Sequence, residues 1–284
     1  MTNPLLIVDS VTKRFGDIVA LDDVSVTFER GEVIGLVGGN GAGKTTLLRL
    51  MCGVYKPSEG QVLFLDKEGV ESPVAEVRKS LGVVPESTGL YHRLTAWENI
   101  RYHARLAGVP DDKAWARASR LADTLEISDS INRPTRGFSK GMRQKTALIR
   151  ALSHDPDVIL LDEPTSGLDV TSSRKVRALV THLRDLGKTV IYSTHNLAEA
   201  QMVCNRIVII HNGTIRANET PEQLLASTQT ESLEDAFVAL TPDASREVSD
   251  SEEDGWFQTK WLKFLTTFGK APSRHITEER GDDD

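Results

Sequence analysis

The sequence predicts an α/β fold, and three observations support this prediction. Short apolar runs typical of buried strands occur at residues 33–37, 81–84, 158–161 and 190–194. A glycine-rich loop and a stretch with apolar residues at helical spacing follow the first of these runs, which gives the order strand, loop, helix. From residue 91 to about residue 133 the apolar pattern is helical. We therefore expect an all-helical insertion in a strand-rich chain.

The N-terminal third of the chain is expected to be mainly strands. Leu5–Val8 and Val24–Phe28 are predicted strands with a turn at Lys13–Asp17 between them, and Gln61–Leu65 is a further one. The helix after the glycine-rich loop is predicted by apolar residues at i, i+3, i+4 and i+7, namely Leu47, Leu50, Met51 and Val54.

Later elements are predicted by caps and turns. Thr95 and Glu98 form a capping box, a second helix is expected from Asp112 to about Leu125, and Ser139 is placed to cap a third. That helix ends before Asp155-Pro156. Three further segments are expected: a turn at 165–169, a helix from about 172 to 186, and a hairpin of 207–210 with 214–217.

Composition indicates a folded protein with a negative charge. The 284 residues are 39% hydrophobic, enough for one large α/β domain or for one domain with an appendage. The net charge of −7 speaks against a nucleic-acid partner, which would require an excess of basic residues. Cys52 and Cys204 lack neighbouring metal ligands, so reduced thiols of a cytoplasmic protein are expected. Residues 1–9 do not resemble a signal peptide, and no apolar run approaches the ~20 residues of a membrane span.

The glycine-rich loop carries the clearest functional signal. Residues 38–45 match G-x-x-x-x-G-K-[ST], in which glycines let backbone N–H groups turn toward phosphates at a helix N-terminus. In such a loop Lys44 reaches the β- and γ-phosphates and Thr45 ligates Mg²⁺. The alternative is a glycine-rich turn with a surface lysine.

Other candidate residues lie at strand ends or in a nearby loop. Asp162 and Glu163 follow a buried strand and provide a Mg²⁺ ligand and a base, although they could be a polar turn. His195 ends the next buried strand, where it would face a ligand crevice unless its role is structural. Phe15 could stack on a nucleobase or pack in a core or hairpin.

Over roughly residues 4–242 the chain resembles the ATP-binding subunit of an ABC transporter. The similarity rests on ordered motifs: a Walker A loop at 38–45, a signature sequence at 139–144, a Walker B strand at 158–163, a D-loop at 166–169 and a switch histidine at 195. It implies a P-loop NTPase (RecA-like) core with an antiparallel β subdomain and an inserted all-α subdomain at about 87–155.

The resemblance also assigns site residues. ATP would be bound by Phe15, Gly38, Asn40, Gly41, Ala42, Gly43, Lys44, Thr45, Thr46, Ser139, Gly141 and Asp169. The catalytic residues would be Glu163, His195, Lys44 and Glu86, and the Mg²⁺ ligands Thr45, Asp162 and Glu86.

Several positions depart from the family pattern. Glu86 stands where the family usually has glutamine, and Gly39 replaces a common proline. Lys140, Met142 and Arg143 alter the signature in a way associated with exporter-type subunits.

The resemblance implies partners as well. A head-to-tail dimer, either a homodimer or a heterodimer with a related ATPase, would enclose two ATP molecules, with Ser139 and Gly141 completing the partner's site. Similarity to sodium and multidrug exporter ATPases favours export through a separate integral-membrane permease, with the chain peripheral on the inner face of the cell membrane. Glu86 to about Arg105 would dock on the permease, unless Trp97 and Ile100 only pack the helical lobe.

Residues 243–284 are expected to form an acidic linker followed by an amphipathic aromatic extension. The extension could lie on a membrane, against a partner helix or on its own domain.

Two other functions compete with transport. A soluble ABC-type ATPase acting on ribosomes or nucleic acid tends to have two cassettes, coiled-coil arms, zinc sites or basic extensions, and none is found here. A GTPase or small-molecule kinase would share only the phosphate loop, and no Asn-Lys-x-Asp guanine motif is present.

Overall fold

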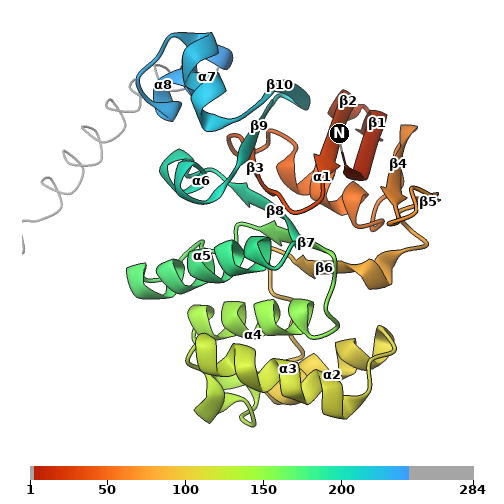
Figure 1. Ribbon diagram of the computed structural model, residues 1–284, viewed down its shortest axis with the longest axis vertical. Helices are drawn as coiled ribbons and strands as arrows, with labels where there is room; N and C mark the ends of the chain where they lie inside the picture. Colours follow the sequence, from red (N-terminus) through yellow and green to blue (C-terminus); the bar gives the residue numbers. More distant parts are fainter. Residues whose placement is uncertain (1–2, 243–284) are drawn as a thin grey trace, which may run out of the picture. The chain divides into compact units, whose positions relative to one another are not determined.

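The computed structural model describes residues 3–242, so the predictions made for residues 243–284 lie outside it. Ten strands and eight α-helices lie in the part described (Figure 1). The strands are β1 (Pro4–Phe15), β2 (Ile18–Glu29), β3 (Val33–Val37), β4 (Glu59–Leu65), β5 (Glu71–Pro73), β6 (Leu81–Val84), β7 (Val158–Asp162), β8 (Thr189–Thr194), β9 (Arg206–His211) and β10 (Thr214–Glu219). The helices are α1 (Lys44–Met51), α2 (Ala96–Leu106), α3 (Asp111–Thr124), α4 (Lys140–Leu152), α5 (Val170–Asp185), α6 (Leu197–Val203), α7 (Pro221–Thr228) and α8 (Leu233–Leu240).

Two β-sheets form the core of the part of the chain that the structure describes, called the unit below. The larger has the strand order β10-β9-β3-β8-β7-β6, in which only the edge strand β10 is antiparallel to its neighbour. The smaller is antiparallel, with the order β2-β1-β4-β5. This architecture confirms the predicted α/β class with a separate antiparallel β subdomain.

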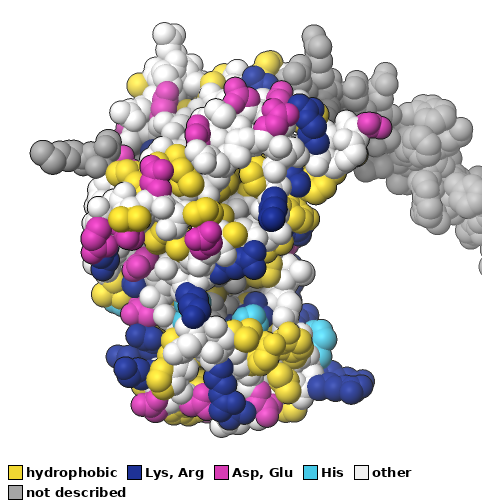
Figure 2. All heavy atoms as spheres, turned by 90° about the vertical axis from the view of Figure 1, so that its right-hand side faces the viewer, with side chains coloured by type: hydrophobic (Ala, Val, Ile, Leu, Met, Phe, Trp, Pro, Cys, Tyr) yellow, Lys and Arg dark blue, Asp and Glu magenta, His cyan; other side chains and the backbone are white. Residues whose placement is uncertain are grey.

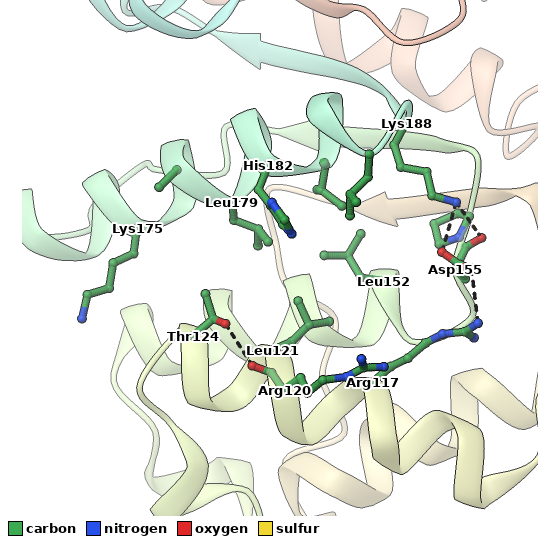
Figure 3. A pocket seen from close by; sticks show the side chains of 14 residues that line it. Arg117, Arg120, Leu121, Thr124, Leu152, Asp155, Lys175, Leu179, His182 and Lys188 are labelled. Carbon is green, nitrogen blue, oxygen red and sulfur yellow. Dashed lines mark hydrogen bonds and ion pairs between the residues drawn. The ribbon is translucent and has the colours of Figure 1, made fainter.

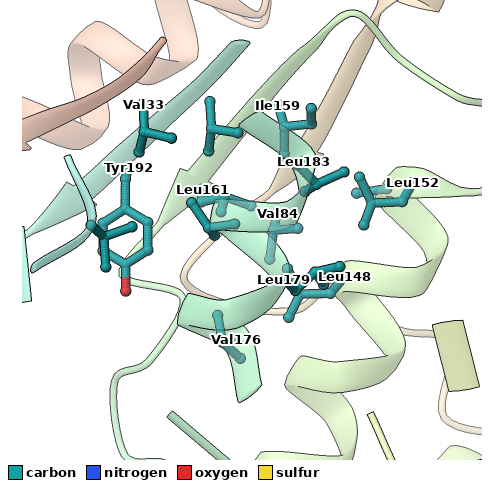
Figure 4. Close-up of a cluster of buried hydrophobic side chains, with 14 of the residues drawn as sticks. Val33, Val84, Leu148, Leu152, Ile159, Leu161, Val176, Leu179, Leu183 and Tyr192 are labelled. Carbon is teal, nitrogen blue, oxygen red and sulfur yellow. The ribbon is translucent and has the colours of Figure 1, made fainter. Parts of the chain in front are cut away.

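Both faces of the large sheet are buried, and successive residues of its central strands point alternately to one face and to the other. Val33, Ile159 and Tyr192 point into a cluster covered by α4 and α5 (Figure 4). Ile34, Leu160 and Ile191 join the cluster around α1 and the small sheet. Because both faces of the central strands are apolar, their sequences are continuous hydrophobic runs, and this made them predictable.

Helices α2, α3 and α4 pack together at one end of the unit, within the predicted insertion (Figure 1). Thr95 accepts from the Glu98 backbone N–H at 3.1 Å and donates its own N–H to the Glu98 carboxylate at 2.8 Å, which confirms the capping box. Ser139 caps α4 by accepting from the Met142 N–H at 3.2 Å. Trp97 packs on the core cluster and Ile100 is fully buried in it.

Some local predictions were wrong. Helix α1 ends at Met51 because Gly53 follows with φ +68°, and Val54 is therefore 66% exposed instead of lying on the apolar face. The first turn is confined to Gly16–Asp17, since β1 extends through Phe15. Helix α5 begins at Val170 because Asp169 caps it, two residues before the predicted start. Strand β5 and helices α6, α7 and α8 were not predicted.

Candidate active site

A cavity of about 300 Å³ lies between the glycine-rich loop and the carboxyl ends of the central strands. Ligands of α/β proteins bind at this edge of the sheet, because loops after parallel strands converge there. The residues that line it are Ala20, Gly39, Asn40, Gly41, Ala42, Gly43, Lys44, Thr45, Thr46, Glu86, Glu163, Ser166 and His195. Predicted residues from four separate segments of sequence, namely the glycine-rich loop, Glu86, Glu163 and His195, therefore meet in one place.

The glycine-rich loop depends on glycine at two positions. A Cβ at Gly38 would overlap the carbonyl oxygen of Ile210 on β9. Gly43 has φ +110°, and a Cβ there would lie 2.8 Å from a methyl carbon of Leu21. The loop can therefore approach the two neighbouring strands only with these residues.

Lys44 is held inside the loop. Its Nζ donates to the carbonyl oxygens of Gly38 at 2.7 Å and Gly39 at 3.0 Å, and the side chain is buried. Burial lowers the pKa of Lys44, while the charges of Glu163, Asp162 and Glu86 oppose this effect. A buried ammonium group at a helix N-terminus is suited to an anionic ligand such as a phosphate.

Oxygen ligands suitable for Mg²⁺ lie beside the lysine. Thr45 Oγ1 donates to Asp162 Oδ1 at 3.4 Å, and Glu86 from the loop after β6 lines the same cavity. Burial raises the pKa of Asp162, against the hydrogen bond from Thr45. Residues 3–242 contain no cluster of three or more His, Cys, Asp or Glu that could hold a metal alone. The donor set fits Mg²⁺ that takes its remaining ligands from phosphates and water, as is usual for this ion.

Glu163 and His195 form a pair at the edge of the cavity. The Nδ1 atom of His195 lies 2.9 Å from both carboxylate oxygens of Glu163. The Glu163 side chain is 13% exposed and the His195 side chain 62%, so solvent reaches the pair from the histidine side. Glu163 has φ +49°, an unfavourable backbone conformation for a residue with a side chain, and its N–H donates to the Ser193 carbonyl at 3.2 Å. A carboxylate at the edge of such a cavity is chemically suited to act as a base.

The remaining predicted residues do not line this cavity. Ser139 and Gly141 lie at the N-terminus of α4, and a Cβ at Gly141 would lie 3.5 Å from Leu168. Asp169 accepts from the N–H and the Oγ of Ser172, both at 2.8 Å, and these bonds lower its pKa. One chain therefore assembles only part of the predicted set.

Phe15 is 42% exposed near the end of β1 and contacts Tyr55, with ring centroids 5.4 Å apart. Lys13 Nζ lies 5.0 Å from the Phe15 ring. Sequence reasoning missed Tyr55, and it also missed Ala20 and Ser166 as residues of the cavity. Ser166 lies in the turn predicted at 165–169, so the sequence contained a signal for it. Ala20 reaches the cavity through the hairpin of β1 and β2, and no sequence pattern marked it as a site residue.

A larger cavity of about 830 Å³ lies between α3 and α5 (Figure 3). Its rim includes Asp155, which pairs with Arg117 at 3.2 Å and Lys188 at 3.0 Å, and buried leucines such as Leu152 and Leu179 lie below. None of the predicted site residues lines it. The candidate active site is therefore assigned to the cavity at the glycine-rich loop because of the side chains that line it, although the other cavity is larger.

Comparison with known proteins identifies the family. A family model described as ABC transporter matches residues 21–166. The chain belongs to the ABC transporter family. It is 42% identical over 233 residues to the ABC transporter ATP-binding protein NatA of Bacillus subtilis (strain 168), an alignment that covers 80% of this chain and 94% of NatA.

Solved structures of ABC cassettes agree with this assignment. One described as the ATP-binding subunit of an ABC transporter has a TM-score of 0.76 and 28% identity, covering 83% of this chain and 99% of the other. The dimeric structure of the ATP-binding cassette MJ0796 with ADP and Pi has a TM-score of 0.70 and 27% identity, covering 76% of this chain and 98% of that one. The predicted family and P-loop fold are confirmed, and the chain is an ATPase that binds ATP.

Proposed function

We propose that this ABC protein dimerises around ATP and uses hydrolysis to drive a separate integral-membrane permease. The observation that carries the proposal is the division of the site: Lys44, Glu163 and His195 meet in one cavity, whereas Ser139 and Gly141 lie outside it. A second cassette would supply the missing half.

Each side chain has a role in hydrolysis under this proposal. The N–H groups of the loop and Lys44 hold the β- and γ-phosphates, and Glu163 accepts the proton of the water that attacks the γ-phosphorus, whose bond to the bridging oxygen of ADP breaks. His195 holds the Glu163 carboxylate through their 2.9 Å contact. Thr45, Asp162 and Glu86 would hold Mg²⁺. When bound, the ion neutralises charge on the phosphates.

The dimer explains why the signature residues lie at a helix N-terminus. Ser139 is exposed and caps α4, so the positive end of the helix dipole and the first N–H groups of the helix lie beside this residue. A γ-phosphate bound to a second cassette would be a suitable anion for them. MJ0796, a structural relative, has been solved as a dimer with ADP and Pi. Both a homodimer and a heterodimer with a related ATPase fit this proposal.

The permease would dock on the predicted region from Glu86 to about Arg105. Ile100 is fully buried and Trp97 is partly buried against the core cluster, so the proposed docking surface does not depend on them. Exposed aromatic and aliphatic side chains remain at Tyr91 and Tyr102, whose rings are 5.5 Å apart, and at Leu106, which is 62% exposed. Hydrophobic and histidine side chains, with basic and acidic ones around them, lie on the lower part of the face in Figure 2. Such a patch suits a partner that is partly apolar.

A peripheral position on the inner face of the cell membrane and transport in the export direction belong to the same proposal. In residues 3–242 no helix is long and apolar enough to cross a membrane. Any attachment by this part of the chain would therefore be through the permease or the membrane surface.

Glu163→Gln tests the proposed hydrolysis. The variant retains the shape of the side chain and loses the proton acceptor, so ATP should still bind and turnover should fall by at least about 100-fold. Sedimentation with ATP should show a stable dimer of the variant, whereas the wild-type dimer should be transient because hydrolysis removes the ATP. Glu68→Gln, on the exposed loop after β4, is the matched control. Wild-type turnover in Glu163→Gln would exclude Glu163 as the base.

Leu106→Asp tests permease docking. The variant should lower recovery of the protein with membranes of cells that express it, with its ATP affinity unchanged. Leu186→Asp is matched, because Leu186 is 61% exposed and lies outside the docking region. Equal recovery of both variants would contradict docking at α2.

A further inference from the structure

A buried carboxylate outside the cavity belongs to none of the predicted motifs. Glu199, on α6, is only 4% exposed and does not line the cavity. Its Oε2 accepts from Thr165 Oγ1 at 2.7 Å, and its Oε1 accepts from Arg177 Nη1 at 3.0 Å. Burial of a charge is costly unless it is paired and hydrogen-bonded, and this carboxylate has both kinds of partner.

The side chain of Glu199 faces away from the end of its own helix. Glu199 is the third residue of α6, the position from which a glutamate commonly turns back to the N-cap. Its backbone N–H donates to Asn196 Oδ1 at 3.0 Å, but its carboxylate reaches the loop after β7. The carboxylate therefore joins two segments instead of completing a capping box.

These two segments are the ones that carry the catalytic pair. Thr165 is two residues after Glu163, and Glu199 is four residues after His195. The contact between Thr165 and Glu199 is thus a buried counterpart of the more exposed contact between Glu163 and His195. Two contacts fix the separation of the segments better than one.

The neighbouring strand β8 supports the same loop. Tyr192 is fully buried, and its hydroxyl donates to Thr165 Oγ1 at 3.3 Å. Burial, followed by the charge of Glu199, raises the pKa of Tyr192, so its hydroxyl keeps the proton that it donates. Thr165 therefore accepts a hydrogen bond from Tyr192 and donates one to Glu199, and both of these side chains are buried.

We propose that Glu199 is a positioning residue for ATP hydrolysis. Through its hydrogen bond with Thr165 it fixes the loop that carries Glu163, and the turn 166–169 after it, against the segment that carries His195. This inference rests on the proposed roles of Glu163 and His195. It adds a residue that touches neither nucleotide nor water and acts through the loop.

Thr165→Val removes the tether with little change in shape. The hydrolysis rate per ATP-binding molecule should fall about tenfold, because small displacements of catalytic groups have effects of that order, while the ATP dissociation constant is unchanged. Thr165→Ser restores the hydroxyl and should restore the rate. Thr165→Ala replaces the valine variant if the latter is not recovered folded.

Arg177→Met separates positioning from stability. It removes the charge partner of Glu199, so the melting temperature should fall, but it leaves the bond from Thr165 in place. The rate per ATP-binding molecule should stay within about twofold of wild type. A rate that falls in Arg177→Met as far as in Thr165→Val would overturn the proposal in favour of a purely structural role.

A double-mutant cycle with His195→Ala decides whether Thr165 acts through the pair. Single-turnover hydrolysis keeps the slow variants measurable. If the tether positions Glu163 against His195, Thr165→Val should have much less effect in the His195→Ala background. The same fold-change in both backgrounds would overturn the proposal. Glu163→Gln is assayed in parallel, so loss of turnover in that variant upholds the proposed function even where the cycle fails.

Discussion

His195 Nδ1 and the Glu163 carboxylate are in contact at 2.9 Å although the residues are 32 positions apart. Strand register produces this contact, because β7 and β8 are parallel neighbours in which Asp162 is paired with Ser193. The residues that follow these strands therefore leave the sheet at the same edge. Under the proposed mechanism, the position of the base Glu163 therefore depends on the register of β7 and β8.

His195→Ala should lower the rate of ATP hydrolysis by about 10-fold or more, with a small change in ATP affinity. The reason is that the proposed phosphate-binding groups are the loop and Lys44, whereas His195 contacts the proposed base Glu163. Steady-state kinetics with ATP as the variable substrate measures the two effects. His182→Ala, an exposed histidine on α5, should behave as wild type. A rise in KM with kcat unchanged would place His195 in ATP binding instead.

Gly38→Ala should abolish ATP binding and destabilise the fold by about 1–3 kcal/mol. The added Cβ overlaps the Ile210 carbonyl oxygen, so the loop or β9 must move. Gly39→Ala is the control in the adjacent position, where a Cβ meets no atom within 4 Å. Nucleotide titration and urea unfolding of both variants check the prediction. An equal loss of ATP binding in both variants would contradict this explanation. It would show that the loop requires the backbone freedom of glycine and not the close approach of Gly38 to Ile210.

Asp162→Asn should raise the melting temperature of the nucleotide-free protein while it weakens Mg²⁺-dependent ATP binding. Burial raises the pKa of Asp162 above its ordinary value, so the folded state disfavours the charged form. The destabilisation is present above the folded pKa and disappears below the unfolded value, and at neutral pH the asparagine relieves it. For a chain of this size the shift is roughly 2–4 °C for each kcal/mol.

Asp155→Asn provides a comparison of opposite sign. Burial opposes ionisation there too, but pairing with Lys188 and Arg117 holds the pKa of Asp155 below its ordinary value. Its amide variant should therefore lower the melting temperature. A lower melting temperature in both variants would contradict the inference that the charge of Asp162 destabilises the nucleotide-free protein.

The residues of the site that could be predicted from sequence have local signals. The loop at 38–45 is a fixed spacing of glycine, lysine and threonine, and Asp162, Glu163 and His195 each end an apolar run. Those strands are recognisable because both of their faces are buried. Ser139 and Gly141 have a motif and a helix cap, but only family resemblance assigns them to a nucleotide.

The residues that sequence missed depend on tertiary register. Ala20 reaches the cavity through the pairing of β1 with β2, and Tyr55 meets Phe15 across a loop. Glu199 is in a short helix that was not predicted, and its partners come from α5 and the loop after β7. No local sequence pattern predicts a contact between segments that are far apart in the chain.

Acid should destabilise the helical subdomain through His103. Burial, followed by the charges of Arg150 and His154, lowers the pKa of His103 to about 4 from 6.5. A cavity of about 400 Å³ is lined by His103, Arg150 and His154, and also by the cationic side chains of Arg78 and Lys79. Between these two pKa values the unfolded chain binds more protons than the folded protein, so stability is lost as the pH falls from about 6.5 toward 4. Part of the effect is shared with His154, whose pKa burial also lowers.

His103→Gln measures this contribution. Melting temperatures at pH 7 and pH 5 should differ less in the variant than in wild-type protein, because one proton uptake linked to unfolding is gone. His92→Gln, at an exposed position before α2, is the matched control and should keep the wild-type difference. Since His103 lies in the proposed docking region, the same pH range should also weaken recovery with membranes. An unchanged pH dependence in His103→Gln would mean that other groups carry the acid lability of the subdomain.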